Sequence, residues 1–134
     1  MSNLENIVNE HFENRSEITP ASATQELKET IEEVISGLDS GTMRVAEKKD
    51  GEWVVNQWLK KAVLLSFLLE DNKVIGGGFT NYYDKVPSKF SGMNKSDFEK
   101  IGARIVPSAN ARRGSYIAPG VVMMPSYVNI GAYV

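Results

Sequence analysis

The chain has 134 residues, enough for one ordinary domain or for a small domain and part of another. Hydrophobic residues make up 42% and charged residues 24% of it, which is typical of globular proteins and excludes the disordered and fibrous classes. The formal net charge of -2 gives no broad positive field, so we do not expect nucleic-acid binding.

The sequence lacks cysteine, a secretion signal and a membrane-spanning stretch, and these absences bear on its compartment and its redox chemistry. There is no cysteine, which excludes disulfides, thiolate metal sites and a cysteine nucleophile. Glu5, Glu10 and Glu13 make the N-terminus unlike the cationic start and apolar run of a secretion signal. The most apolar stretch, 62–69, is much shorter than the ~20 residues that cross a bilayer. We therefore expect a cytoplasmic protein with no membrane partner.

Two amphipathic helices are predicted at the start of the chain. The first should cover residues from about 3 to 14. Ser22 and Gln25 have the spacing of a capping box for the second, and Gly41 is a plausible stop. The apolar residues at helical spacing are Leu4, Ile7, Val8 and Phe12 in the first helix, and Leu27, Ile31, Val34, Ile35 and Leu38 in the second.

A hairpin and a third helix should follow. Asp50 and Gly51 form a turn signal between two short strand patterns, because both positions tolerate a positive φ. Residues 58–69 fit a buried helix, although so apolar a run is also compatible with a strand. In the helical interpretation Lys60 and Lys61 face water.

The middle of the chain gives weaker signals. The three glycines at 76–78 lack the lysine of a P-loop and the spacing of a dinucleotide fingerprint, so a flexible connector is the better interpretation. Pro87 disfavours helix at Val86. A short capped helix is predicted at 96–100, and 104–107 reads as a strand.

The tail contains two imperfect hexapeptide units after a basic link at Arg112, Arg113 and Gly114. One is Ile-Ala-Pro-Gly at 117–120 and the other is Ile-Gly-Ala-Tyr at 130–133. Six residues after Ile117 lies Met123, whereas six residues before Ile130 lies Met124. The two registers disagree by one residue, so periodicity alone indicates only a weak repeat.

Six segments along the chain are distinctive in sequence and in order: Glu17-Ile18-Thr19-Pro20, Leu38-Asp39-Ser40-Gly41, Arg44-Val45-Ala46-Glu47-Lys48, Gln57-Trp58-Leu59-Lys60-Lys61-Ala62-Val63-Leu64-Leu65-Ser66-Phe67, Asp84-Lys85-Val86-Pro87, and Met124-Pro125-Ser126-Tyr127-Val128-Asn129-Ile130-Gly131-Ala132-Tyr133-Val134. Through these segments the whole chain resembles the tetrahydrodipicolinate N-succinyltransferase family. Together they are far more specific than a six-residue repeat.

The resemblance implies a fold and a reaction. It implies an α/β (α+β) N-terminal domain at 1–108 and, at 109–134, the first coil of a left-handed parallel β-helix of hexapeptide repeats. In the family three subunits form a trimer with active sites between neighbours. The implied reaction moves a succinyl group from succinyl-CoA, a co-substrate and not a tightly bound cofactor, to the amino group of a ring-opened imine diacid in lysine biosynthesis through diaminopimelate.

Arg104 is the position at which the family places a substrate-binding arginine. The substrate has two carboxylates, and the planar guanidinium fork can donate two parallel hydrogen bonds to a carboxylate. The resemblance favours substrate binding at Arg104 over an exposed or structurally paired arginine.

Other candidates for chemistry are poorer. His11, the only histidine, is better explained as a solvated or packed side chain than as a catalytic base. Asp84 and Lys85 are neighbours that point in different directions in a strand. Arg112 and Arg113 could neutralise CoA phosphates, but ordinary surface arginines are the more common case. No metal site is expected.

No catalytic residue is assigned in this chain, because the resemblance places the family's catalytic acids and the CoA-holding coils after residue 134. We therefore expect an N-terminal portion that is inactive alone, truncated one coil into its β-helix and without a polar cap. Two alternatives remain: a non-catalytic substrate-binding or assembly module, and a hexapeptide-repeat transferase that uses acetyl-CoA.

Overall fold

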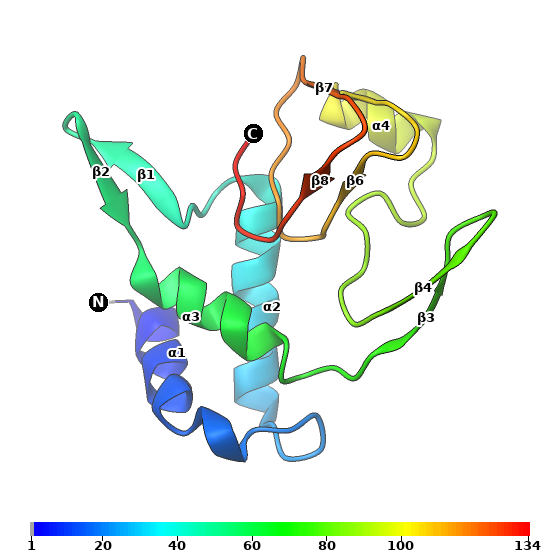
Figure 1. The fold of residues 1–134 in the computed structure, drawn as a ribbon. Helices are drawn as coiled ribbons and strands as arrows, with labels where there is room; N and C mark the ends of the chain where they lie inside the picture. The colour runs from blue at the N-terminus through cyan, green and yellow to red at the C-terminus, as the bar shows by residue number, and fades with distance from the viewer. Residues whose placement is uncertain (1) are drawn as a thin grey trace. The chain divides into compact units, whose positions relative to one another are not determined.

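The computed structural model describes residues 2–134 and has an α/β architecture (Figure 1). The chain divides into two compact units. One contains the chain up to Val34 together with Asn56–Val86, and the other contains Ile35–Val55 and Pro87–Val134. The helices within the described residues are α1 (Asn3–Glu13), the 3-10 helix η1 (Arg15–Glu17), α2 (Gln25–Ser40), α3 (Gln57–Ser66) and α4 (Lys95–Ile101).

The first unit has a core of helices. Helix α1 packs against α3, and both predicted amphipathic helices are confirmed within two residues of their expected ends. Val8, Leu27 and Leu65 are completely buried. Each lies on the apolar stripe of its helix, so the 3.6-residue period of the sequence determines which faces meet.

The cap of α2 differs from the prediction. The Oγ1 of Thr24 accepts a hydrogen bond from the Leu27 amide at 3.2 Å, so Thr24 is the capping residue. Ser22, which was expected to cap, instead accepts a hydrogen bond from the Thr19 amide at 2.9 Å and donates one to the Glu17 carbonyl at 3.0 Å. A local turn before the helix therefore uses the Ser22 hydroxyl.

Helix α3 confirms the helical interpretation of the apolar run and excludes the strand. Its buried residues are Leu59, Ala62 and Leu65, at helical spacing. Lys60 faces water as predicted. The expectation for Lys61 was wrong: its side chain is half-buried, and its Nζ donates a hydrogen bond to the Asn9 side chain at 3.0 Å. A long lysine stem can cover apolar surface while its ammonium group finds a polar partner.

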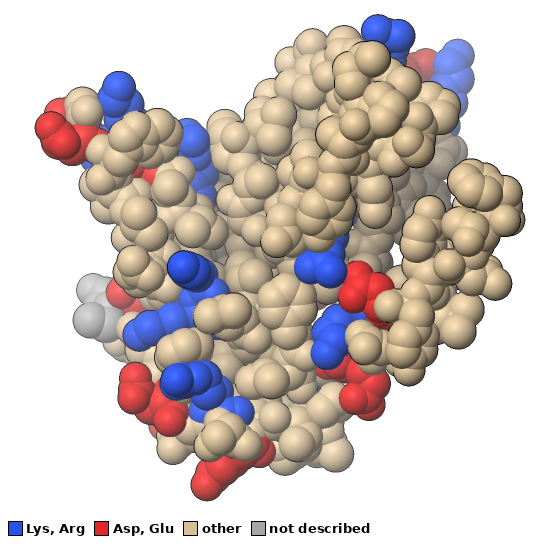
Figure 2. Space-filling view, viewed as in Figure 1, with Lys and Arg blue, Asp and Glu red and all other residues tan. Residues whose placement is uncertain are grey.

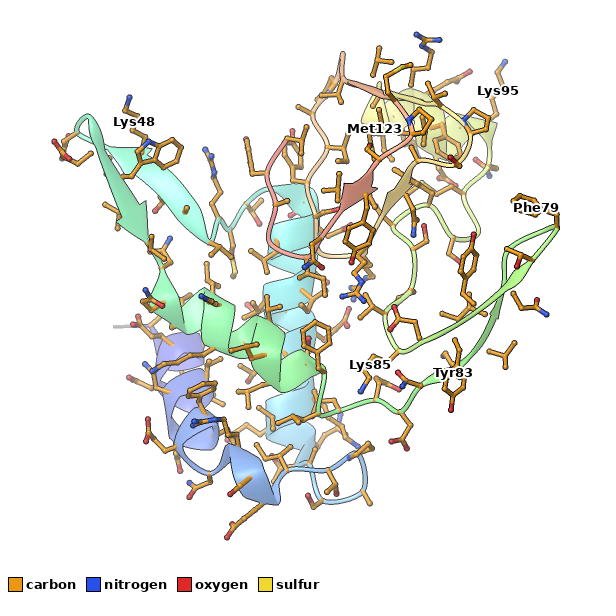
Figure 3. The ribbon with its side chains drawn as sticks, viewed as in Figure 1. Lys48, Phe79, Tyr83, Lys85, Lys95 and Met123 are labelled. Carbon is orange, nitrogen blue, oxygen red and sulfur yellow. The ribbon has the colours of Figure 1, made fainter. Side chains whose placement is uncertain are left out.

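The predicted glycine connector is a β-hairpin. Strand β3 (Lys73–Gly76) pairs antiparallel with β4 (Asn81–Asp84), and the Gly77 amide donates a hydrogen bond to the Thr80 carbonyl at 2.8 Å. Gly78 has φ +80°, which glycine adopts without strain. Phe79 lies at the tip, 96% exposed, and Tyr83 also projects into solvent (Figure 3).

The second unit begins with the predicted hairpin. Strand β1 (Ala46–Lys49) pairs antiparallel with β2 (Glu52–Val55) through Asp50 and Gly51, whose φ angles are 50° and 85°. Both positive values match the expected turn. Figure 2 shows acidic and basic side chains together at the tip of this hairpin.

Short parallel pairs form the end of the second unit. Strand β5 (Arg104–Ile105) pairs with β7 (Val122–Met123). Strand β6 (Asn110–Ala111) pairs with β8 (Tyr127–Val128), and these two lie side by side in Figure 1. The predicted strand at 104–107 is therefore confirmed in a shorter form. The sequence separation between partners is 18 residues in the first pair and 17 in the second. The separation shortens by one residue between Met123 and Tyr127.

The inward positions of these strands form a small apolar core. Ala111, Ile117 and Met123 are each less than 5% exposed, and Val128 packs against them. Met124 is 62% exposed. The core therefore follows the register that steps from Ile117 to Met123.

A buried ion pair links distant segments of the second unit. The Lys89 Nζ lies 3.0 Å from the Asp39 Oδ1, and the Lys89 side chain is only 6% exposed. Asp39 also accepts a hydrogen bond from the Gly114 amide at 2.9 Å. Lys89 donates another to the Asp39 carbonyl at 2.9 Å, in the last turn of α2, where a cation is favoured.

Gly41 and the ring pair of Tyr116 and Tyr133 make further contacts in the second unit. Gly41 has φ +79°, as its predicted role as a helix stop requires, and it lies against the Tyr116 ring. The rings of Tyr116 and Tyr133 are 4.6 Å apart, and the Arg44 guanidinium carbon lies 3.7 Å from the centre of the Tyr133 ring. These contacts hold the 116 and 133 segments together.

The predicted helix at 96–100 is α4. Its N-terminus has a complete capping box, in which Asn94 and Asp97 each bond to the other's backbone amide. Gly102 ends the helix with φ 72°. None of the helices in residues 2–134 has the length and apolar character needed to cross a membrane.

Candidate functional site

Arg104 lies on the outward face of β5. Its amide donates a hydrogen bond to the Val121 carbonyl at 2.9 Å, and its register partner is Val122. Because side chains alternate along a strand, Ile105 and Met123 turn into the core while Arg104 and Val122 turn outward. Val122 is 46% exposed, so the register partner of Arg104 is an exposed aliphatic residue.

The Arg104 side chain makes no hydrogen bond and no ion pair with any residue in the range 2–134. A guanidinium carries five N–H donors in a planar fork. The N–H donors of Arg104 are directed to solvent. The strand that carries Arg104 is held in place by the ladder hydrogen bonds and by the apolar core. The arrangement is suited to binding a carboxylate through two parallel hydrogen bonds.

The outward face of β6 and β8 carries a second polar group of residues. Tyr127 lies on β8, and Asn129 follows that strand two residues later on the same face. Arg112 follows β6, and the 17-residue separation places it opposite Asn129. Three donors converge on the Asn129 Oδ1: the Ile130 amide at 2.9 Å, the Tyr127 hydroxyl at 3.2 Å and the Arg112 Nη1 at 3.3 Å.

Sequence reasoning missed this cluster. The only signal was the alternation of polar and apolar residues in Tyr127, Val128 and Asn129, which places both polar side chains on one face. The pairing of Arg112 with Asn129 depends on the 17-residue ladder, which periodicity left undecided.

The two neighbouring arginines point to different partners. Arg112 contacts Asn129, and its guanidinium carbon lies 5.8 Å from the centre of the Tyr127 ring. The Nη2 of Arg113 donates a hydrogen bond to the Ser36 hydroxyl at 3.0 Å, and the Arg113 amide donates one to the Pro87 carbonyl at 3.0 Å. Arg113 therefore supports the packing of its segment.

The remaining candidates are distributed elsewhere. His11 is 22% exposed, and its Nε2 lies 4.0 Å from a carboxylate oxygen of Glu26, so this contact is an ion pair only when the imidazole is protonated. The Lys85 Nζ donates a hydrogen bond to the Phe67 carbonyl at 3.2 Å. Over residues 2–134 the structure has no cluster of three or more His, Asp or Glu side chains arranged to hold a metal ion.

Comparison with known proteins assigns the family. The model of the tetrahydrodipicolinate N-succinyltransferase N-terminal family matches residues 3–69, which is half of the chain. The chain belongs to this family. Residues 3–69 include α1, α2, the first hairpin and α3.

Curated relatives extend the similarity to the tail. The chain is 58% identical over 131 residues to the 2,3,4,5-tetrahydropyridine-2,6-dicarboxylate N-succinyltransferase of an Azoarcus species, covering 98% of this chain and 48% of the relative. It is 65% identical over 124 residues to the enzyme of that name from Thioalkalivibrio sulfidiphilus, covering 92% and 45%. For the Acinetobacter baylyi enzyme the identity is 58% over 134 residues, covering 100% and 49%. The chain thus spans about half the length of these relatives.

Proposed function

We propose that this chain is the N-terminal part of a CoA-dependent N-succinyltransferase that acts on tetrahydrodipicolinate in the diaminopimelate route to lysine. The names of the relatives and their 58–65% identity support this function. Water first adds to the C=N bond of the cyclic imine, and the ring opens to an amine and a ketone. The amine nitrogen then forms a C–N bond with the thioester carbonyl carbon. The C–S bond breaks, and the thiolate of CoA takes up the proton that the amine loses.

We further propose that the tail is the first coil of a left-handed parallel β-helix, with a domain boundary at residue 108. The parallel pairs at separations of 18 and 17 residues support the coil, as does the parallel bridge between Tyr116 and Tyr133. Each pair stacks a later segment on an earlier one, as successive coils of a solenoid do. A homotrimer in the cytoplasm, with succinyl-CoA as co-substrate, completes the proposal.

The observation that carries the substrate assignment is the exposed guanidinium of Arg104. The proposed acceptor is a dicarboxylate, and Arg104 offers a guanidinium fork with no partner among residues 2–134 on a strand whose backbone is held by the ladder. The role of this residue is binding and orientation of a carboxylate. Proton transfer is left to groups outside this chain.

The test uses the full-length protein in a thiol-release assay with succinyl-CoA and the diacid. Arg104→Ala should raise KM for the diacid and lower kcat/KM roughly 10- to 100-fold, since losing a charge-assisted hydrogen bond costs ~1.5–3 kcal/mol. Arg104→Lys is the matched control, because it keeps the charge and loses the fork, and should recover only part of the loss. Unchanged kinetics in both variants would refute the role of Arg104.

The same assay separates the alternatives. The 134-residue chain should release no thiol from succinyl-CoA, whereas the full-length protein should. If the full-length protein instead binds the diacid but releases no thiol, the binding-module hypothesis replaces the enzyme hypothesis. Equal rates with acetyl-CoA and succinyl-CoA would contradict the assignment of the acyl donor.

A further inference from the structure

One face of the β1–β2 hairpin is apolar and exposed. Register partners in an antiparallel pair share a face, so Trp53 lies with Lys48, and Val55 lies with Ala46. Trp53 is 66% exposed and Val55 is 50% exposed. We call these four residues the tryptophan face. A two-stranded hairpin is only marginally stable by itself, so an apolar face of this kind is typical of a hairpin that another segment covers.

The opposite face of the hairpin carries charge. Glu47 and Lys49 form an ion pair on it at 2.6 Å, and Glu52 is the register partner of Lys49. Its apolar residue, Val54, is 36% exposed. Covering this face would desolvate several charges. On the tryptophan face the charged residue is Lys48, whose long stem can lie along an apolar surface while its ammonium group stays in water.

The segment that leads into the hairpin advances along the stack of parallel strands. We call β5, β6 and Tyr116 the first layer, and β7, β8 and Tyr133 the second layer, since each member of the second pairs with its counterpart in the first. Gly41 lies against the Tyr116 ring, and the Arg44 guanidinium carbon lies 3.7 Å from the centre of the Tyr133 ring. Between positions 41 and 44 the chain therefore advances by one layer, about 4.8 Å.

The hairpin begins at Ala46, directly after this step. In Figure 1 the last segment of the chain, in red, lies between the hairpin and the orange segment that precedes it. Strands β7 and β8 each have one strand partner within residues 2–134, so their outer edges are open to a further parallel strand. Each hairpin strand has four residues and spans roughly 13 Å, more than twice the spacing between layers, so the hairpin can extend beside a third layer.

We propose that the tryptophan face packs against a third layer, formed by the residues that follow Val134. Continuation of the 17- or 18-residue separation places about residues 148–151 opposite Gly131 and Tyr133. The inference rests on the proposed function in one respect, because it takes the chain to continue as a β-helix. The length of the relatives supports this continuation, since they are about twice as long as the chain.

The proposed occupant is a segment of the same subunit. The Val134 amide donates a hydrogen bond to the Tyr116 carbonyl at 2.9 Å, and the Val134 carbonyl accepts one from the Ala118 amide at 2.8 Å. These bonds hold the end of the second layer in place, and the contact of Arg44 with Tyr133 joins that layer to the base of the hairpin. A segment attached to the second layer reaches the tryptophan face at high effective concentration, without a separate association step.

The test places the photoreactive amino acid p-benzoylphenylalanine at position 53 of the full-length protein. After irradiation the main product should migrate as a single chain on a denaturing gel. Peptide mass spectrometry should locate its crosslink within about one strand length of residues 148–151. The matched control carries the same amino acid at position 52, on the charged face. It should give roughly 10-fold less of this crosslink, because neighbouring side chains in a strand point to opposite faces.

Three results of this experiment would overturn the inference. A product of twice the chain mass would place a second copy of the protein on the tryptophan face. A crosslink confined to residues 1–134 would show that the third layer does not reach this face. Equal crosslink yields from positions 52 and 53 would show that the hairpin is not held by the tryptophan face.

Hydroxyl-radical oxidation of the unaltered full-length protein needs no variant. Trp53 should be oxidised roughly 10-fold more slowly than in the urea-unfolded protein, because a covered ring keeps little of its exposure. A rate near that of the unfolded protein, which a 66% exposed ring implies, would refute the contact. Thiol release by the same protein is measured separately. Thiol release without the crosslink removes this inference alone, and the crosslink without thiol release removes the transferase assignment alone.

Discussion

The two compact units are stabilised in different ways. In the first, apolar side chains of α1, α2 and α3 are buried, and Leu27 and Leu65 are completely inaccessible. In the second, much of the organisation comes from hydrogen bonds between distant segments. Asp39 bonds to Lys89 across 50 residues and to Gly114 across 75, and Arg113 bonds to Ser36 across 77.

This difference determines which substitutions matter in each unit. A helical core loses free energy in proportion to the apolar volume that is removed. A unit organised by hydrogen bonds between distant segments depends on particular polar pairs, whose loss leaves a buried group unsatisfied. Hydrogen exchange, read residue by residue, measures the two units separately in one sample.

The largest effect is expected from Leu27→Ala in the first unit. The side chain is fully buried, so the free energy of unfolding should fall by ~2–5 kcal/mol. Leu64→Ala is the control, since Leu64 lies on α3 and is 47% exposed, and its loss should be within ~1 kcal/mol. Urea unfolding followed by tryptophan fluorescence measures both. Equal losses would show that the helical core does not carry the stability of this unit.

The second largest effect is expected from Lys89→Met in the second unit. Methionine fills the space of the lysine stem but leaves the Asp39 carboxylate without its cation. We expect a loss of ~2–3 kcal/mol, below the range for fully buried pairs because Asp39 is 30% exposed.

The control for Lys89 is Lys95→Met. The Lys95 side chain is 92% exposed and pairs with Glu99 at 3.4 Å, an arrangement worth less than ~0.5 kcal/mol. Hydrogen exchange of the Gly114 amide reports the result directly, because this amide donates to Asp39. Unchanged protection of Gly114 in Lys89→Met would contradict the proposed role of the pair.

Gly41→Ala tests backbone and contact together. Gly41 has φ +79°, and a Cβ there would lie 2.8 Å from the Tyr116 ring. Gly51→Ala is the control, with φ +85° and no atom within 4 Å of the added carbon. The backbone cost of about 1 kcal/mol should be common to both, and Gly41→Ala should lose more because the ring must move. Equal losses of stability in thermal unfolding would show that the Tyr116 ring moves aside at no measurable cost.

The sequence predicted the parts of the fold that depend on local periodicity. Helices α1, α2 and α3 follow from apolar residues at 3.6-residue spacing, and the β1–β2 turn follows from Asp50 and Gly51. The β3–β4 hairpin was missed because Gly76 and Gly77 have no side chains to show alternation. The ion pair of Lys89 with Asp39 joins residues 50 positions apart, and no local pattern indicates such a contact.

The candidate site was predictable only in part. Arg104 came from the family resemblance, and strand alternation explains why its side chain is exposed while Ile105 is not. The cluster around Asn129 depends on the parallel register, which shortens from 18 to 17 residues after Met123. The hexapeptide registers counted from Ile117 and from Ile130 differ by one residue. The sequence alone therefore cannot show which register the parallel strand pairs follow.

The smallest effect concerns the start of α2, where Thr24 and Ser22 compete for the cap. Thr24→Ala removes the acceptor for the Leu27 amide and should cost about 1 kcal/mol. Thr24→Ser keeps the hydroxyl and should cost only a few tenths of that. Protection of the Leu27 amide against hydrogen exchange should fall in the alanine variant alone. If protection persists in Thr24→Ala and disappears in Ser22→Ala, the cap is Ser22 after all, and the spacing of Ser22 and Gln25 was the correct signal.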